Sequence, residues 1–259
     1  MDDTVIALTI PQIALGYVFV LLVLAILKKR QISREKILLF ATFRMTVQLV
    51  AVGFLLTIII ENPHPLLTVL VVLTMIGFAI FTIFRKFKHQ LSPELKRMIA
   101  LSLPMGTLAS LIYFLFVVIR IDPYYNPQYI IPISGMIVGN SMTGISLGIH
   151  TMLNRFNDNK EKLETTLNLG ATPKKASQHI INESFDAAIM PTLNNMLGMG
   201  IIFLPGMMTG QILSGVIPTT AIMYQIGVML GILGGVALTT FIVLRLGYKT
   251  FFNAEAQLR

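Results

Sequence analysis

Two acidic residues, Glu183 and Asp186, stand out as candidate ligands for a hard metal cation. They are three positions apart, so on a helix they lie about one turn from each other on one face. Their carboxylate oxygens could give a hard cation a stopping place. The alternative is an ordinary carboxylate pair that answers the nearby Lys174 and Lys175. The sequence leaves both interpretations open.

Methionine supplies a second, softer type of ligand. The chain has 15 Met, and Met207 and Met208 are adjacent in the segment LPGMMTG. Thioethers suit Cu(I) better than Fe(II), although adaptable core packing is the other interpretation of such a pair. With no Cys and four His, the chain has no disulfide framework, no Cys-ligated metal site and no thiol nucleophile, and a His-rich metal centre is not expected.

The composition shows what kind of fold must position these residues. Hydrophobic residues make up 54% of the 259 positions and charged residues 12%, about half the charge of a soluble domain. The mean hydropathy is +0.76, and several apolar runs of about 20 residues match the hydrocarbon depth of a bilayer. We expect an all-α integral membrane protein forming one transmembrane domain over 1–259. About seven spans are predicted, at 4–27, 37–60, 66–84, 98–119, 129–153, 186–213 and 220–244.

The positive charges test this assignment and give an orientation. Eighteen of the 20 Lys and Arg residues fall on alternate connections or after the last span, and the exceptions are Arg44, inside the second span, and Arg120. Because positive residues stay on the cytoplasmic side, the N-terminus is predicted outside and the C-terminus inside. The net charge of +8 is spread over all inner loops, which indicates topology signals and anionic-lipid contacts in the bilayer. We therefore expect no nucleic-acid partner.

Polar residues at membrane depth suggest a route for cargo. A charged side chain at the bilayer centre costs roughly 2.5–3.5 kcal/mol on insertion scales, so Arg44 snorkels to the surface, serves such a route or steadies a polar interface. The fifth span has a start at Pro132 to Gly135 that cannot pack as an ordinary helix beginning, and Pro191 and Pro205 predict at least one break in the sixth. Broken helices survive at this depth only where they are buried or line a cavity. We place the route along spans two, five and six, with Arg44, Gln48, Asn140, Asn194, Asn195 and Gln211 as candidates. For the amides, hydrogen bonding between helices is the alternative.

The segment 154–185 is the one substantial inner loop. Its pattern predicts a helix that ends at Gly170, a residue suited to a left-handed C-terminal turn. Thr172 followed by Pro173 then predicts the start of a second helix. Leu163, Leu167 and Leu169 form a partial apolar stripe that we expect to be exposed, since the loop has no domain of its own to bury it. The segment is either a solvated amphipathic linker or a stiff elbow that a soluble motor subunit grips.

The same segment carries a family resemblance. KLETTLNLGATPKKA (162–176) resembles the cytoplasmic EAA-type loop of ABC transporter permeases, with Glu164, Thr165 and Thr166 at the EAA positions and Gly170 four residues later. Together with IPISGMIVGNSM (131–142) and LPGMMTGQILSG (204–215), the chain is similar to the FetB family. These are bacterial permease subunits of an iron-export ABC transporter, with plant relatives linked to aluminium tolerance.

The resemblance implies a bacterial cytoplasmic-membrane permease for iron efflux that works with a separate ABC ATPase. Two ATPase copies and a homodimer of this chain are expected. The coupling residues would be Leu163, Glu164, Leu167, Gly170, Ala171, Thr172 and Pro173. The chain has no G-x-x-x-x-G-K-[ST] phosphate loop, so we expect no enzyme activity and no cofactor of its own, with ATP and Mg²⁺ on the partner.

Two other classes of function compete with this hypothesis. An ion-gradient-driven secondary transporter or channel would need buried acids along its pathway, and no Asp or Glu lies well inside a predicted span. An intramembrane enzyme would need paired acids, a His cluster or a Ser and His pair in the spans, and none is present. The ATP-driven exporter is therefore the leading hypothesis.

Overall fold

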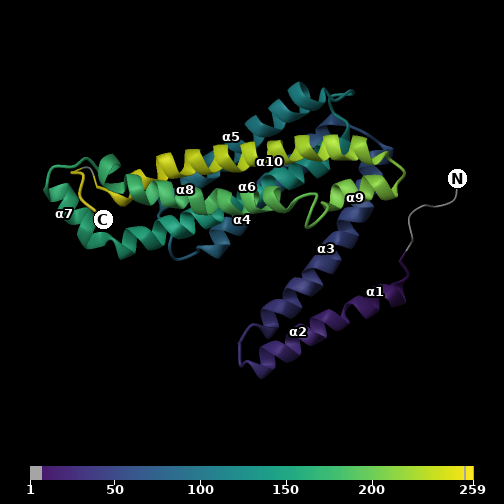
Figure 1. The fold of residues 1–259 in the computed structure, drawn as a ribbon, viewed down its shortest axis with the longest axis horizontal. Helices are drawn as coiled ribbons and strands as arrows, with labels where there is room; N and C mark the ends of the chain where they lie inside the picture. Colours follow the sequence, from purple (N-terminus) through teal and green to yellow (C-terminus); the bar gives the residue numbers. More distant parts are fainter. Residues whose placement is uncertain (1–7, 254, 259) are drawn as a thin grey trace. The chain divides into compact units, whose positions relative to one another are not determined.

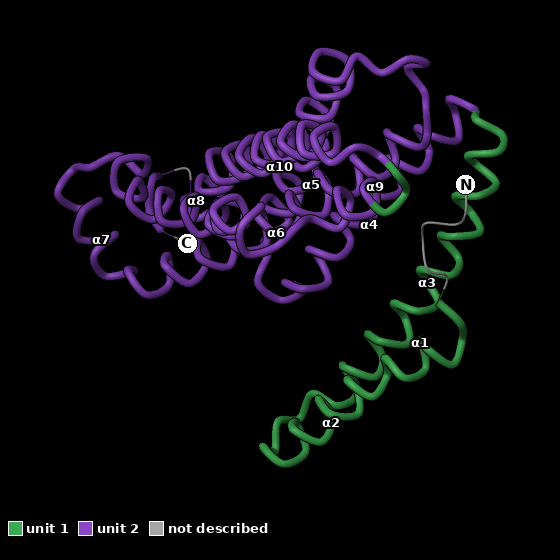
Figure 2. Tube along the Cα trace, turned by 45° about the vertical axis from the view of Figure 1, so that its right-hand side comes forward, with its two compact units in different colours: residues 1–63, 213–215 green, residues 64–212, 216–259 purple. Residues whose placement is uncertain are grey.

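The computed structural model describes residues 8–253 and 255–258, and all its long elements are α-helices. The chain divides into two compact units (Figure 2). Unit 1 contains residues 1–63 and 213–215, and unit 2 contains residues 64–212 and 216–259. The single transmembrane domain predicted over 1–259 stays a prediction.

Unit 1 is a helical hairpin. The short helix α1 (Ile10–Gly16) leads into α2 (Val18–Lys29), which returns as α3 (Glu35–Glu61). Tyr17 and Thr46 share a hydrogen bond between their hydroxyl groups and so join the two arms of the hairpin. No residue of α2 is buried, and a helix that is apolar on every side suits a surface that faces lipid.

Unit 2 contains the remaining helices (Figure 1). Four of them begin with proline after a residue whose side chain accepts a backbone N–H, namely His64, Ser92, Asn126 and Thr172; these are favourable helix starts. The elements of unit 2 are α4 (Pro65–Lys86), α5 (Pro93–Ile112) with a π-helical continuation (Tyr113–Ile119), α6 (Pro127–Asp158), α7 (Lys160–Asn168), α8 (Pro173–Gly198), α9 (Gly206–Leu213), α10 (Pro218–Gly247) and a final 3₁₀ turn (Tyr248–Phe251).

Close contacts at small residues show in which direction each helix runs relative to its neighbours. Gly144 of α6 faces the side chain of Val236, and Gly247 of α10 faces the side chain of Met152, so α6 and α10 run parallel. α5 runs the other way, because Gly106 faces Thr239 whereas Gly247 also faces Leu95. Gly144 and Gly148 also face the carbonyl oxygens of Ala188 and Ser184, so α8 runs antiparallel to α6. Small residues allow this close approach of helix backbones in membranes.

Because the helices run in these directions, the positively charged residues of unit 2 lie together at one end, which we call the basic end. α4 begins at the opposite end, since Thr68 donates a hydrogen bond to the carbonyl of Tyr125 in the loop before α6. By the positive-inside rule the basic end faces the cytoplasm, and Arg120 lies at the other end. The basic end carries Arg85, Lys86, Lys88, Lys96, Arg97, Arg155, Lys160, Lys162, Lys174, Lys175, Arg245 and Lys249.

The predicted set of about seven spans corresponds to six long apolar helices in the described part of the chain and one broken segment. The segment predicted as one helix over 186–213 is split, because α8 ends at Gly198 and α9 begins at Gly206. Gly200 takes a left-handed φ of +82° in the break, and Pro205 comes directly before α9. A break in the sixth span was therefore correctly predicted.

Two prolines lie within continuous helices, and one of them, Pro132, differs from the prediction. Pro191 lies inside α8 without ending it, and Pro132 lies inside a continuous α6 that begins at Pro127. The expected irregular start of the fifth span at Pro132 is wrong. The side chain of Pro132 is exposed, so its ring lies on a side of α6 that does not pack against the core.

The packing of α5 against α10 allows a direct test. A Cβ added at Gly106 would lie 2.6 Å from the backbone nitrogen of Thr239, whereas one added at Gly77 in α4 would meet nothing within 4 Å. We expect Gly106→Ala to lower stability by about 1–3 kcal/mol through overpacking. Gly77→Ala should leave stability unchanged or slightly raised, because alanine favours the helix. Thermal unfolding in detergent measures both, and equal effects would contradict the proposed contact.

Candidate coupling elbow and transport site

The chain turns sharply between α7 and α8. Gly170 has a φ of +88° with open space around the position of a side chain, and its N–H donates to the carbonyl of Leu167 at 2.9 Å. The side chain of Thr172 accepts from the N–H of Lys175, and Pro173 is the first residue of α8. The sequence prediction of a helix, a glycine turn and a second helix is confirmed. We call residues 160–176 the elbow.

The leucines of the elbow have different surroundings. Leu163 is 3% exposed and belongs to the hydrophobic core of unit 2, and Leu167 packs against that core. Leu169 is 83% exposed. The expectation that all three are exposed is wrong for Leu163 and Leu167, because α7 folds back onto α8, which buries Leu163 and half-buries Leu167.

The other predicted coupling residues lie around this turn. Glu164 is exposed and lies 4.0 Å from the ammonium group of Lys160. Thr172 is exposed, and Ala171 and Pro173 are half-buried. Of the predicted coupling residues, Glu164, Gly170 and Thr172 are therefore exposed, and the neighbouring Leu169 is exposed as well.

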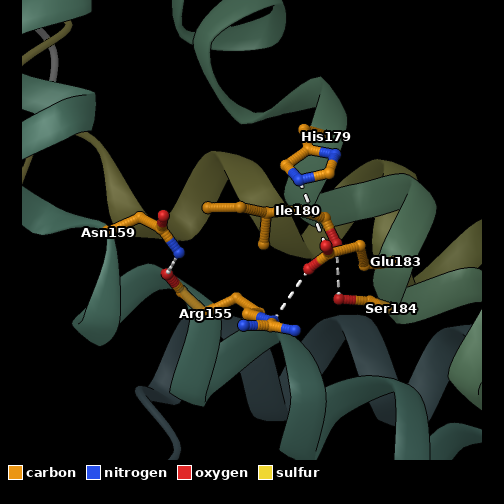
Figure 3. A network of polar contacts seen from close by, with 6 residues as sticks. All are labelled: Arg155, Asn159, His179, Ile180, Glu183 and Ser184. Carbon is orange, nitrogen blue, oxygen red and sulfur yellow. Dashed lines mark hydrogen bonds and ion pairs between the residues drawn. The ribbon is translucent and has the colours of Figure 1, made fainter.

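An ion pair network joins α8 to α6 beside the elbow (Figure 3). The Nε of Arg155 lies 2.8 Å from one carboxylate oxygen of Glu183, and Nε2 of His179 lies 3.1 Å from the other. Asn159 donates a hydrogen bond to the carbonyl of Arg155 at 2.9 Å. Both oxygens of Glu183 are therefore engaged within the protein.

The candidate metal ligands are not brought together. Glu183 faces Arg155 of α6, whereas Asp186 is exposed and lines a pocket between α8 and α10. Met208 is buried, and Met207 packs against the core. Within residues 8–253 and 255–258 no group of three His, Asp or Glu is placed to hold a metal ion. A metal role for these four residues stays a prediction.

The candidate route residues fall into separate places. Arg44 and Gln48 line one hollow on α3 in unit 1. In unit 2, Asn140 donates to the carbonyl of Met136 on its own helix at 2.8 Å. The contacts of Gly144 and Gly148 with α8 place Asn140 opposite Thr192, within one turn of the exposed Asn194 and Asn195. Gln211 is half-buried on α9. Their role in a route stays a prediction.

Sequence reasoning missed a set of buried hydroxyl groups between α10 and its neighbours. Ser110 of α5 donates to the carbonyl of Gly231 at 2.7 Å. In the described chain, Ser141 and Thr240 are fully buried, and their side-chain oxygens have no hydrogen-bond partner. A signal was available for Ser110 and Ser141, which lie four and three positions from the contact glycines Gly106 and Gly144.

Comparison with known proteins identifies the family. Residues 10–252 match the uncharacterised protein family UPF0014. The chain belongs to this family. It is 33% identical over 252 residues to the "Probable iron export permease protein FetB" of Escherichia coli, covering 97% of this chain and 95% of that protein.

Further UPF0014 relatives occur in bacteria and plants. The "UPF0014 membrane protein YjkA" of Bacillus subtilis is 33% identical over 252 residues, 96% of this chain and 97% of that protein. The Arabidopsis thaliana "Protein ALUMINUM SENSITIVE 3" is 31% identical over 246 residues, 95% of this chain and 88% of that protein. No solved structure matches the chain. With its apolar helices, the chain is a multi-pass membrane protein of the UPF0014 family.

Proposed function

We propose that this permease is the membrane subunit of an ATP-driven exporter that moves iron out of the cell. A separate ABC ATPase would supply the energy by gripping the elbow. The relative from Escherichia coli is named a probable iron export permease. The chain itself contains no phosphate-binding loop motif. ATP hydrolysis that drives transport would therefore take place on another polypeptide.

The observation that supports coupling most strongly is the stiff connection from the elbow into the membrane. α8 starts at Pro173 and continues unbroken for 26 residues, about 39 Å at the α-helical rise. The same helix packs between the elbow and the central helices α6 and α10. A push at Gly170 would therefore move one continuous helix whose far end carries the candidate residues Asn194 and Asn195.

We further propose two copies of the chain with two ATPases, with ATP and Mg²⁺ bound to the ATPases. The competing function is a transporter or channel driven by an ion gradient. Two experiments distinguish these functions. An ATPase captured with the permease from its native membranes supports the exporter. Transport that continues without ATP supports the alternative.

The glycine of the elbow provides a sharp test of coupling. Gly170→Val should greatly weaken association with the ATPase and uncouple hydrolysis from transport, since a left-handed φ costs an L-residue about 1–2 kcal/mol and a β-branched residue more. Gly170→Asn should retain most coupling, because asparagine tolerates this conformation. Co-purification and ATP hydrolysis in liposomes measure both effects.

Gly200→Val is the matched control, since Gly200 also has a positive φ in open space but lies at the far end of α8. It should keep the ATPase bound. Full coupling in Gly170→Val would show that the elbow is only a linker.

Two leucines of the elbow allow docking of the ATPase to be tested separately from packing in the core of unit 2. Leu169→Ala should weaken ATPase association by several-fold without changing thermal stability, because this side chain is exposed. Leu163→Ala should instead lower stability by about 2–5 kcal/mol, as expected for a buried leucine. Unchanged association for Leu169→Ala would remove this residue from the docking surface.

The cargo can be tested with the reconstituted permease and ATPase. We expect Fe²⁺ to stimulate ATP hydrolysis more than Mn²⁺, Zn²⁺, Cu⁺ or Al³⁺ added at equal concentration. A response to another of these ions would replace iron as the cargo, and a flat response to all of them would reject metal export.

A further inference from the structure

A pocket of about 550 Å³ lies between α8 and α10 at the basic end. It is separate from the face of α8 that packs on α6, which uses Ile180, Ser184 and Ala188. Its apolar lining comes from both helices, with Ile181 and Phe185 on α8 opposite Phe241 and Leu244 on α10.

The charges of the pocket are arranged along its length. Lys174 and Arg245 supply two cations. Because α8 runs away from the basic end, Lys174 lies at the cytoplasmic end of the pocket and Asp186 at the deep end, about 18 Å further along the helix. The amides of Gln178 and Asn182, which hydrogen-bond each other at 2.9 Å, lie between them. The pocket is therefore cationic and polar towards the cytoplasm and has apolar walls further in.

We infer that this pocket binds an anionic phospholipid of the cytoplasmic leaflet. The phosphate would lie between Lys174 and Arg245, within reach of the Tyr248 hydroxyl, and an acyl chain would lie against Phe185 and Phe241. Basic pockets between helices on the cytoplasmic side of a membrane are suited to anionic head groups. Lys174 draws the phosphate towards the cytoplasmic end of the pocket, away from the carboxylate of Asp186.

The apolar walls favour a lipid over a soluble phosphate. A free anion would leave Phe185 and Leu244 without an apolar partner, and it would not cover Phe241, over whose ring the guanidinium of Arg245 lies 5.6 Å from the centroid. Phe241 is 51% exposed, and Leu238, about one turn deeper on α10, is 43% exposed, so the apolar surface continues from the pocket along α10. A lipid fills both parts of the site, because its head group is charged and its chains are apolar.

The sequence contains no Trp, so one introduced tryptophan can report on lipid contact. Phe241→Trp places it in the pocket, and Phe81→Trp is the control. Phe81 is similarly exposed, at 56%, and lies one turn from Arg85 as Phe241 does from Arg245. The purified chain is reconstituted in phosphatidylcholine vesicles with increasing fractions of acyl-brominated phosphatidylglycerol or, separately, acyl-brominated phosphatidylcholine.

The brominated phosphatidylglycerol should quench Phe241→Trp at a mole fraction about fivefold or more below that needed for phosphatidylcholine, since each cation near an anionic head group contributes about that factor. Adding Lys174→Gln and Arg245→Gln should abolish the preference. Adding Lys88→Gln and Arg97→Gln, two cations of the same end outside the pocket, should leave it intact.

Equal quenching of Phe241→Trp by the two lipids would overturn the inference, as would an equally strong preference at Phe81→Trp. A second copy of the chain seated in the pocket would leave the introduced tryptophan unquenched by either lipid and would also overturn it. Loss of quenching when inorganic phosphate is added would support the phosphate position at Lys174 and Arg245. No ATPase is needed, so this result is independent of the proposed function.

Discussion

The close approach of α10 to its neighbours is the contact on which the rest of unit 2 depends. Gly106 brings the backbone of α5 against Thr239, and Gly144 brings α6 against Val236. In a bilayer there is little hydrophobic driving force between helices, so van der Waals contact of this kind and hydrogen bonds such as that from Ser110 to Gly231 must supply the association. These contacts fix which helices run parallel, and therefore which loops share an end.

That arrangement explains how much of the fold could be predicted from sequence. Positive charges on alternate loops indicate helix directions because the membrane itself imposes them. Gly170 and the Thr172 and Pro173 pair predict the elbow because backbone conformation at these positions depends on local chemistry. Both predictions rest on effects that act within a few residues or through the bilayer, and both agree with the structure.

The failures concern contacts between distant segments. Leu163 was expected to be exposed because its loop has no core, yet α7 folds back and uses the core of unit 2. Glu183 was paired with Asp186 because the two are one turn apart, yet Arg155 of α6 faces Glu183 alone. Pro132 was expected at an irregular helix start, but its side chain is exposed and α6 is continuous from Pro127. Spacing along one helix does not show which neighbour each face meets.

The faces of α8 explain why Glu183 and Asp186 have different surroundings. One face packs on α6 through Ser184 and Ala188, with Glu183 beside it in the ion pair to Arg155. Another face, with Phe185 and Asp186, is open to the pocket that α8 shares with α10. Because Arg155 of α6 pairs with Glu183 of α8, movement of α8 relative to α6 would break that ion pair, whereas movement relative to α10 would change the width of the pocket. A lever built on α8 would therefore pivot at its contact with α6 and open or close the side facing α10.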